Sequence, residues 1–225
     1  MKAADVMVRD VVTVHPETDV ADAVKLLAER DISALPVVDQ QGGLVGIISE
    51  ADLIHRAEIG TEKHRSWIME SMTAATILAE DFAKSHGKKV GEIMTTEVVT
   101  ASEDDSLAHI ASLFERHRIK RVPIVRGSRI VGVVSRSNLI QALASATPAP
   151  GGEPDADRRI RDELLSRLAK EQNWTDFGSR NVIVTDGTVH LWGLISSDAE
   201  RKALIALAEG VPGVTQVVDE MIPAY

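Results

Sequence analysis

Two short stretches place a hydroxyl and a second polar side chain three residues apart, directly after a run of β-forming residues. They are Ser49-Glu50-Ala51-Asp52 and Ser135-Arg136-Ser137-Asn138. At the start of a helix, a carboxylate is stabilised by the helix dipole and can accept hydrogen bonds from two neighbouring hydroxyl groups. A hydroxyl beside free backbone N–H groups at the same helix start suits a phosphate. Taken alone, such a pair is more often an ordinary helix cap, so the surrounding sequence decides its meaning.

Both stretches belong to a duplicated segment. Asp5-Val6-Met7 returns 87 residues later as Glu92-Ile93-Met94. After a turn that is one residue shorter in the second copy, Ser49 matches Ser135 at an offset of 86. Agreement over roughly 50 residues with one gap indicates a repeated supersecondary unit rather than chance.

Each copy predicts the element order β-α-β-β-α. An extended stretch leads into apolar residues at helical spacing, and two β-rich runs follow, separated by a glycine-containing turn. A second helix then begins at a serine that can act as its N-cap. In the first copy the segments are a stretch to Val14, a helix over 20–27, strands over 35–38 and 45–48, and a helix from Ser49. In the second copy they are a stretch to Ala101, a helix over 107–114, strands over 122–125 and 130–134, and a helix from Ser135.

Three further segments complete the chain. Residues 57–89 predict a mostly helical insert, and the Pro- and Gly-rich residues 147–156 predict a flexible linker. After an apolar helical face over 160–168, two β-rich runs flank Asp186-Gly187, which is a type I′ hairpin signal. Ser197-Asp198-Ala199-Glu200 is a capping box that opens a helix ending at Gly210, and a last strand covers 214–222. The predicted order of this part is α-β-β-α-β.

The composition argues against several classes of function. The chain has no cysteine, which removes disulfides, thiolate metal sites and cysteine nucleophiles. A net charge of −9 and 3% aromatic residues argue against a nucleic-acid-binding surface. The histidines show no HExxH pattern, and His55 and His64 in the insert stand nine residues apart. No Walker, GxSxG or GxGxxG motif occurs, so we expect neither catalysis nor a bound metal.

The two copies resemble CBS motifs, and together they resemble a Bateman module. The resemblance rests on Asp5-Val6-Met7 and on residues 33–39 (SALPVVD) and 46–53 (GIISEADL), with counterparts at 92–94, 121–125 and 132–139. Residues 155–225 are similar to a BON domain through residues 189–195 (VHLWGLI) and 210–214 (GVPGV). The resemblance implies an α/β (α+β) fold with two β-α-β-β-α repeats, packed as a pseudo-two-fold pair, and a small α-β-β-α-β domain.

These resemblances divide the chain into five parts. They are a first CBS motif at 1–56, a helical insert at 57–89, a second CBS motif at 90–146, a flexible linker at 147–156 and a BON domain at 157–225.

CBS pairs typically bind adenosine-containing ligands in clefts between the two motifs. Each motif offers an Asp for the ribose hydroxyls and a Ser or Thr three residues earlier for phosphate. By this resemblance Asp52 would bind ribose and Ser49 would bind phosphate. The base pocket would be formed by Thr13, Val14, Ile32, Ser33, Ala34 and Pro36. We expect AMP, ADP or ATP as a regulatory ligand, ahead of NAD or S-adenosylmethionine, and no other cofactor.

The second copy departs from this pattern because Asn138 stands in place of the Asp. A neutral partner for the ribose would lower the affinity about tenfold. Lys120, Arg121 and Arg136 lie near this predicted cleft, where they could hold further phosphate or form only a solvated basic edge. The residues assigned to the second cleft are Thr100, Ala101, Lys120, Arg121, Pro123, Ser135, Arg136 and Asn138.

BON domains are associated with attachment to phospholipid or membrane surfaces. Residues 155–225 hold 12 acidic and 8 basic side chains, and only Arg158, Arg159, Arg161 and Arg167 approach the cation cluster that anionic lipid requires. The same four arginines would also fit an exposed helix flank. We therefore expect an interaction or output module for an unknown protein target, with phospholipid as the alternative partner.

The sequence thus predicts a non-catalytic adenine-nucleotide sensor without a nucleic-acid partner. CBS pairs resemble modules that dimerise through their helices, so we expect a homodimer. The amino terminus lacks a signal-type apolar run, and no stretch approaches the roughly 18 apolar residues of a membrane span, so we expect a cytoplasmic protein. The alternative is a structural or membrane-surface docking adaptor that binds no small ligand.

Overall fold

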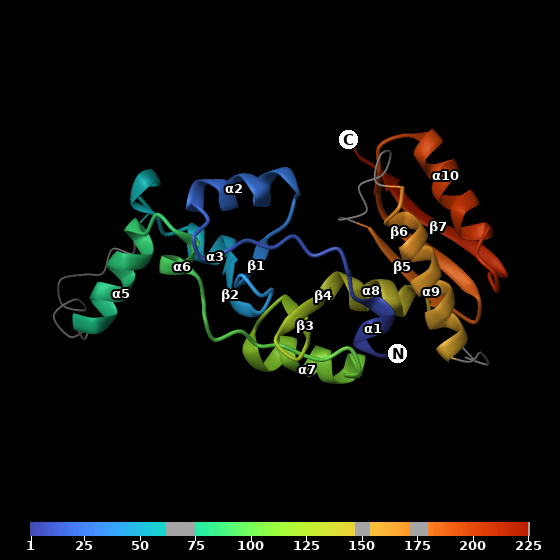
Figure 1. Ribbon diagram of the computed structural model, residues 1–225, viewed down its shortest axis with the longest axis horizontal. Helices are drawn as coiled ribbons and strands as arrows, with labels where there is room; N and C mark the ends of the chain where they lie inside the picture. The colour runs from blue at the N-terminus through green and yellow to red at the C-terminus, as the bar shows by residue number, and fades with distance from the viewer. Residues whose placement is uncertain (62–74, 147–153, 172–179, 225) are drawn as a thin grey trace. The chain divides into compact units, whose positions relative to one another are not determined.

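The computed structural model describes residues 1–61, 75–146, 154–171 and 180–224 (Figure 1). Parts of the predicted insert and linker, residues 62–74 and 147–153, therefore lie outside the described residues. The chain forms two compact units that do not follow its linear order. We call residues 12–98 with 128–130 the repeat-1 unit, and residues 1–11, 99–127 and 131–225 the repeat-2 unit.

The repeat-1 unit is built around an antiparallel hairpin in which Ala34 faces Ser49 and Pro36 faces Ile47. Gly42 supplies the positive φ of +80° that the predicted turn requires. Apolar side chains from α2, the hairpin and α6 form one buried core. The elements are α2 (Val20–Glu29), β1 (Ala34–Val38), β2 (Leu44–Ser49), α3 (Glu50–Leu53), the 3₁₀ helix η1 (Ala57–Ile59), α5 (Ala75–His86) and α6 (Val90–Ile93).

The repeat-2 unit contains the matching hairpin and a core of its own. Ser106 opens its first long helix by accepting a hydrogen bond from the backbone of His109, and Ser135 caps the helix after the hairpin. Its CBS elements are α1 (Ala3–Val6), α7 (Leu107–His117), β3 (Arg121–Arg126), all but the first two residues of β4 (Arg129–Ser135), and α8 (Arg136–Ala144).

Each copy gives its leading segment to the core of the other copy. Val8 pairs with Val133 of β4 in the repeat-2 unit, and Thr95 pairs with Ile47 of β2 in the repeat-1 unit. The leading segments differ from the extended stretches that the sequence predicts, because each begins with a four-residue helix, α1 or α6. Only single residues near their ends, Val14 among them, form parallel bridges to the hairpins.

Two glycines make these exchanged contacts possible. A Cβ added at Gly132 would lie 2.6 Å from Sδ of Met7 and 3.1 Å from the carbonyl oxygen of Val8. A Cβ at Gly46 would meet Met94 in the same way, at 2.5 Å from its Sδ. The repeated Gly and Met are therefore a matched pair that locks each leading segment onto the opposite hairpin.

The C-terminal domain, residues 154–224, packs two helices on one face of a three-stranded sheet (Figure 1). The sheet order is β5-β6-β7, with β5 and β6 antiparallel and β6 and β7 parallel. Asp186 and Gly187 have φ of +51° and +73°, which confirms the predicted type I′ hairpin. The elements are α9 (Pro154–Leu168), β5 (Asn181–Thr185), β6 (Thr188–Ile195), α10 (Asp198–Glu209) and β7 (Gln216–Pro223).

The predicted capping box of α10 forms only in part. The Ser197 hydroxyl accepts a hydrogen bond from the backbone N–H of Glu200 (3.2 Å), as a capping box requires. The Glu200 carboxylate, however, accepts from the N–H of Ser196 and from Arg180, with which it forms a buried ion pair at 2.7 Å. The competing cation explains why Glu200 does not bond to the N–H of Ser197.

Candidate functional site

The residues predicted to form the first base pocket lie beside β1 in the repeat-1 unit. The N–H of Val14 donates to the carbonyl oxygen of Pro36 at 3.1 Å, and the carbonyl oxygen of Val14 accepts from Val38 at 2.9 Å. Thr13 and Val14 therefore run alongside the strand that carries Pro36. Ile32 packs partly against the core at the end of α2, where its N–H donates to the carbonyl oxygen of Leu27.

The hairpin brings the other predicted residues to the start of α3. Ala34 is directly opposite Ser49 in the strand register. The carbonyl oxygen of Ser33 accepts a hydrogen bond from the N–H of Glu50 at 3.1 Å, at the first residue of α3. The structure thus gathers Ser33, Ala34, Ser49 and Asp52 around one helix start.

Asp52 is half-buried, and its carboxylate is held by three hydrogen bonds. Oδ2 accepts from the backbone N–H of Ser49 at 2.9 Å and from its hydroxyl at 2.7 Å. Oδ1 accepts from the hydroxyl of Thr95 at 3.2 Å. The Ser-x-x-Asp pair therefore does cap α3, and two of the three donors to its acid are hydroxyl groups, which a ligand hydroxyl can replace.

Thr95 is the site residue that sequence reasoning missed. It belongs to the second copy, yet it lies against Asp52 because the leading segments are exchanged between the cores. The offset of 87 residues that relates Met7 to Met94 also relates Val8 to Thr95. Val8 cannot donate a hydrogen bond from its side chain, so the two copies differ at this position too.

The second predicted cleft has the same backbone arrangement in the repeat-2 unit. The N–H of Ala101, the residue after Thr100, donates to the carbonyl oxygen of Pro123 at 3.1 Å, and the carbonyl oxygen of Lys120 accepts from the N–H of Arg136 at 3.1 Å. The three basic side chains of this predicted cleft differ in their exposure to solvent. Lys120 and Arg136 are exposed, and the guanidinium of Arg136 lies 6.0 Å from the centre of the Phe114 ring. Arg121 is half-buried and interacts with other groups of the protein.

Asn138 is buried, and both its side-chain oxygen and its side-chain nitrogen are hydrogen-bonded within the protein. Its Oδ1 accepts from the N–H of Ser135 at 2.8 Å and from the Ser135 hydroxyl at 2.9 Å. Its Nδ2 donates to Oε1 of Gln141 at 3.2 Å. With 5% of its surface exposed, Asn138 is less accessible than the half-buried Asp52 at the matching position of the first copy.

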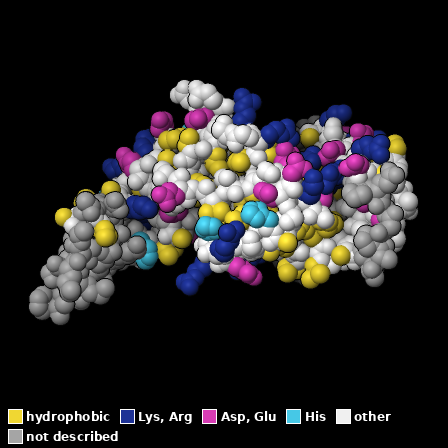
Figure 2. Space-filling model, turned by 90° about the horizontal axis from the view of Figure 1, so that it is seen from below, with side chains coloured by type: hydrophobic (Ala, Val, Ile, Leu, Met, Phe, Trp, Pro, Cys, Tyr) yellow, Lys and Arg dark blue, Asp and Glu magenta, His cyan; other side chains and the backbone are white. Residues whose placement is uncertain are grey.

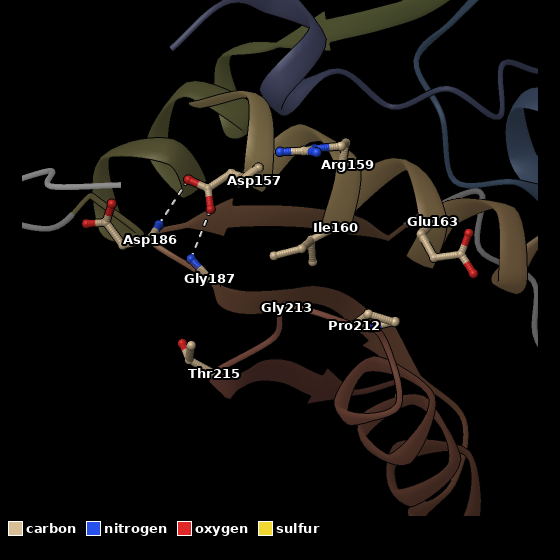
Figure 3. A pocket seen from close by; sticks show the side chains of 10 residues that line it. Asp157, Arg159, Ile160, Glu163, Asp186, Gly187, Pro212, Gly213 and Thr215 are labelled. Atoms are coloured by element: carbon tan, nitrogen blue, oxygen red, sulfur yellow. Dashed lines mark hydrogen bonds between the residues drawn. The ribbon is translucent and has the colours of Figure 1, made fainter. Parts of the chain in front are cut away.

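An open groove of about 680 Å³ lies in the C-terminal domain, between α9, the β5–β6 turn and the loop before β7 (Figure 3). The Asp157 carboxylate accepts hydrogen bonds from the N–H groups of Asp186 at 3.0 Å and Gly187 at 2.9 Å. Arg159 and Glu163 also line the groove. Asp157 is thus engaged in holding the turn onto α9, and no sequence motif had indicated this groove.

The four arginines of α9 are not the exposed cation group that the sequence suggested. Arg161 is 2% exposed, and Arg158 forms an ion pair with Asp5 at 2.7 Å. Arg167 pairs with Glu163 of its own helix, and the exposed Arg159 donates a hydrogen bond to the backbone carbonyl oxygen of Asp155 at 3.2 Å. This arrangement offers little to an anionic lipid surface.

The described residues contain no group of three or more potential metal-ligating side chains. Nδ1 of His55 donates to the carbonyl oxygen of Thr61 at 3.1 Å in the tautomer that carries its proton there, whereas His64 lies outside the described residues. Within the same ranges, no helix has the length and hydrophobicity to span a bilayer. On the face shown in Figure 2, cationic and anionic side chains are interspersed rather than segregated.

Two family matches cover most of the chain. The CBS domain matches residues 3–58 and 90–145, and the BON domain matches residues 156–222. An uncharacterized protein from Methanocaldococcus jannaschii is 30% identical over 154 residues, which cover 64% of this chain and 91% of that protein. The inosine-5'-monophosphate dehydrogenase of the same organism is 30% identical as well, but the match covers 23% of that enzyme.

A plant protein and its crystal structure are also similar to this chain. CBSX2, a chloroplastic CBS domain-containing protein of Arabidopsis thaliana, is 29% identical over 135 residues, which cover 57% of this chain and 57% of CBSX2. The crystal structure of CBSX2 in complex with AMP has a TM-score of 0.57 at 26% identity, covering 65% of this chain and 98% of that chain. The repeats at 3–58 and 90–145 thus have a structural counterpart that binds a nucleotide.

Proposed function

Because this chain belongs to the CBS-domain proteins, with two CBS domains followed by a BON domain, we propose that it is a non-catalytic regulatory protein that binds an adenine nucleotide. AMP, ADP or ATP binds in the first CBS motif. The observation that carries this proposal is the half-buried Asp52 carboxylate, bonded to Ser49 and Thr95 beside the base-pocket residues. The AMP complex of the related CBSX2 supports the choice of ligand.

The bonding of Asp52 would allow a nucleotide to enter without leaving the half-buried carboxylate unpaired. A carboxylate has about four acceptor positions. The Ser49 and Thr95 hydroxyls occupy two of them, and the two ribose hydroxyls offer equivalent donors. If the ribose replaces these hydroxyls, the Ser49 hydroxyl becomes available to a phosphate oxygen. Asp52 keeps the backbone bond from Ser49, so the start of α3 stays in place.

Calorimetric titration of AMP, ADP and ATP into Asp52→Ala tests this proposal. We expect the affinity to fall about ten- to a hundredfold, because hydrogen bonds to a charged group contribute roughly 1.5–3 kcal/mol. Glu50→Ala is the matched control, since Glu50 is exposed and lies two residues before Asp52. The nucleotide affinity of this variant should match that of the wild type. An unchanged affinity in well-folded Asp52→Ala would remove Asp52 from the site.

Thermal shift across a ligand panel separates the sensor from a structural or membrane-docking adaptor. A ligand at a hundredfold excess over its Kd stabilises the folded state by about 2.7 kcal/mol. The panel holds AMP, ADP, ATP, NAD and S-adenosylmethionine. A flat response to all five would support the adaptor.

The assembly and location of the protein remain part of the proposal. We propose a cytoplasmic homodimer that associates through the CBS helices, with the BON domain as the interaction or output module. Ile140 and Leu143, three residues apart on α8, are 65% and 73% exposed and are the apolar side chains such a contact would cover. Light scattering on the purified chain measures its oligomeric state directly.

A further inference from the structure

Strand β5 of the C-terminal domain is buried on both faces of its sheet. Val182, Val184 and their neighbours on one face form the domain's own core with α9 and α10. Side chains alternate along a strand, so Asn181 and Ile183 point to the opposite face. Ile183 is fully buried there and belongs to the hydrophobic core of the second CBS motif, with Val6 and Met7. We call this outer face, made by Asn181, Ile183, His190 and Trp192, the docking face.

Arg161 of α9 ties this domain to α1. Its guanidinium donates to the carbonyl oxygens of Ala4 at 3.0 Å and Met7 at 2.7 Å, and to that of Val182 in its own domain at 2.8 Å. The first two acceptors lie at the end of α1, where carbonyl groups carry partial negative charge. Burial lowers the pKa of Arg161 to about 9, so the side chain is still charged at pH 7. A cation that is buried on carbonyl groups marks a specific contact, because it is costly unless each donor finds an acceptor.

Polar contacts surround the apolar centre of the docking face. Arg158 pairs with Asp5 at 2.7 Å, and Arg9 pairs with Asp162 at 2.6 Å. The indole N–H of Trp192 donates to the hydroxyl of the buried Ser145 at 3.2 Å. Cations and anions thus alternate between the two partners, which fixes the register of the contact.

One hydrogen-bond chain links the docking face to the second nucleotide position. Nδ2 of Asn181 donates to the carbonyl oxygen of Val6 at 3.0 Å and to Oε1 of Gln141 at 3.0 Å. The same Oε1 accepts from Nδ2 of Asn138 at 3.2 Å. Asn138 occupies the position of Asp52 in the first motif, so the C-terminal domain is two hydrogen bonds from a predicted ribose contact.

We propose that the BON domain docks on the second CBS motif of its own chain and that docking opposes nucleotide binding there. A ribose oxygen that takes the Asn138 N–H now bonded to Gln141 competes with Gln141, whose acceptor is oriented by Asn181 of the docked domain. By linkage, a nucleotide bound at Asn138 weakens docking by the same factor. This linkage rests on the proposed nucleotide binding, whereas docking itself does not.

Hydrogen exchange of the full chain without nucleotide tests the docking. In Asn181→Ala, exchange in residues 1–11 and 180–186 should rise about two- to tenfold, the range expected when neutral hydrogen bonds are lost. Arg161→Leu should give a larger rise at the same two segments. Exchange in α10 reports whether the BON domain stays folded, and exchange in α2 should be unchanged. Gln216→Ala is the matched control, because Gln216 is an exposed amide on β7.

Nucleotide titration in an Asp52→Ala background tests the linkage at the second motif. Adding Asn181→Ala should tighten binding of ATP about two- to tenfold, and adding Gln216→Ala should change nothing. Saturating ATP should in turn raise exchange in residues 1–11 and 180–186.

The outcomes separate the two ideas. Unchanged exchange in both Asn181→Ala and Arg161→Leu would overturn docking. The linkage would be overturned if Asn181→Ala raised exchange but left the affinity for ATP unchanged. It would also be overturned if ATP did not bind to the Asp52→Ala background, with or without Asn181→Ala. If the wild-type chain binds no adenine nucleotide at either motif, the proposed function and the linkage both fail, and the exchange data still decide whether the domain docks.

Discussion

At the residue scale, the amide of Asn138 matches the hydrogen-bonding groups of its neighbours. Its Nδ2 donates to Gln141, whose oxygen also accepts from Asn181. An aspartate here would present an oxygen to another acceptor and would place a charge at a position that is 5% exposed. The substitution that restores the CBS pattern should therefore disturb the protein.

We predict that Asn138→Asp lowers the free energy of unfolding by about 1–3 kcal/mol, the cost of a buried polar group that loses its partner. Urea unfolding at pH 7 measures this loss. Ser137→Asp is the control, because it adds the same charge one residue earlier, at an exposed position in the first turn of α8, where the helix dipole favours an acid. Equal stability of the two variants would show that the Asn138 amide is not needed as a donor.

Sequence reasoning located the residues whose neighbours are local and missed those whose partners are distant. Ser49 and Asp52 were found because a helix start brings them together within four residues. Thr95 contacts Asp52 across 43 residues, through an exchange that leaves no periodic signal. From the sequence, Arg161 is interpreted as part of an exposed helix flank. Its acceptors are backbone carbonyl groups, which every residue carries, so no residue type in the sequence indicates them.

At the element scale, the exchange of leading segments depends on a glycine in each hairpin. We predict that Gly132→Ala lowers the free energy of unfolding by about 1–3 kcal/mol, the usual cost of overpacking. The new Cβ would lie 2.6 Å from Met7 Sδ and 3.1 Å from a backbone oxygen, and only the thioether can move aside easily. Gly210→Ala is the control, since its Cβ would meet nothing closer than 3.4 Å and its φ of −77° suits alanine. Chemical denaturation compares the two variants, and equal stabilities would contradict the prediction.

The elements themselves were largely readable from the sequence. The duplicated hairpins, their glycine turns and the Asp186-Gly187 turn follow from local chemistry, and the structure contains them. The capping box at Ser197 formed only in part because Arg180, 20 residues away, pairs with Glu200. Local rules thus predicted where elements begin and turn, while tertiary charges and the exchange decided which partners they take.

At the scale of the whole molecule, structural units and sequence motifs have different boundaries. The repeat-2 unit joins residues 1–11, the second CBS motif and the BON domain into one body. The predicted linker ends at residue 156, but α9 already begins at Pro154, and Arg158 and Arg161 of its next turns bond to α1. The amino-terminal segment therefore belongs to the contact surface of the last domain, which a linear division into domains does not show.

The docking face also makes the unit sensitive to pH through His190. This side chain is 9% exposed, its Nδ1 has no hydrogen-bond partner within the described part of the chain, and Glu220 Oε1 lies 3.9 Å from it. Burial lowers the pKa of His190 below its ordinary value, and Glu220 offsets only part of that effect. The unfolded chain, with an ordinary histidine pKa of about 6.5, then binds more protons than the folded chain.

Stability contributed by neutral His190 is consequently complete above about pH 6.5 and declines as the pH falls from there toward the lower pKa of the folded state. We predict that His190→Gln loses stability less steeply than the wild type between about pH 7 and pH 5, measured by urea unfolding at each pH. His109→Gln, at an exposed position on α7, is the control substitution. Because His190 lies on the docking face, acidification of the wild type should also lower the protection factors of residues 1–11, that is, exchange corrected for the pH dependence of the intrinsic rate. Parallel slopes for all three proteins would rule out this role.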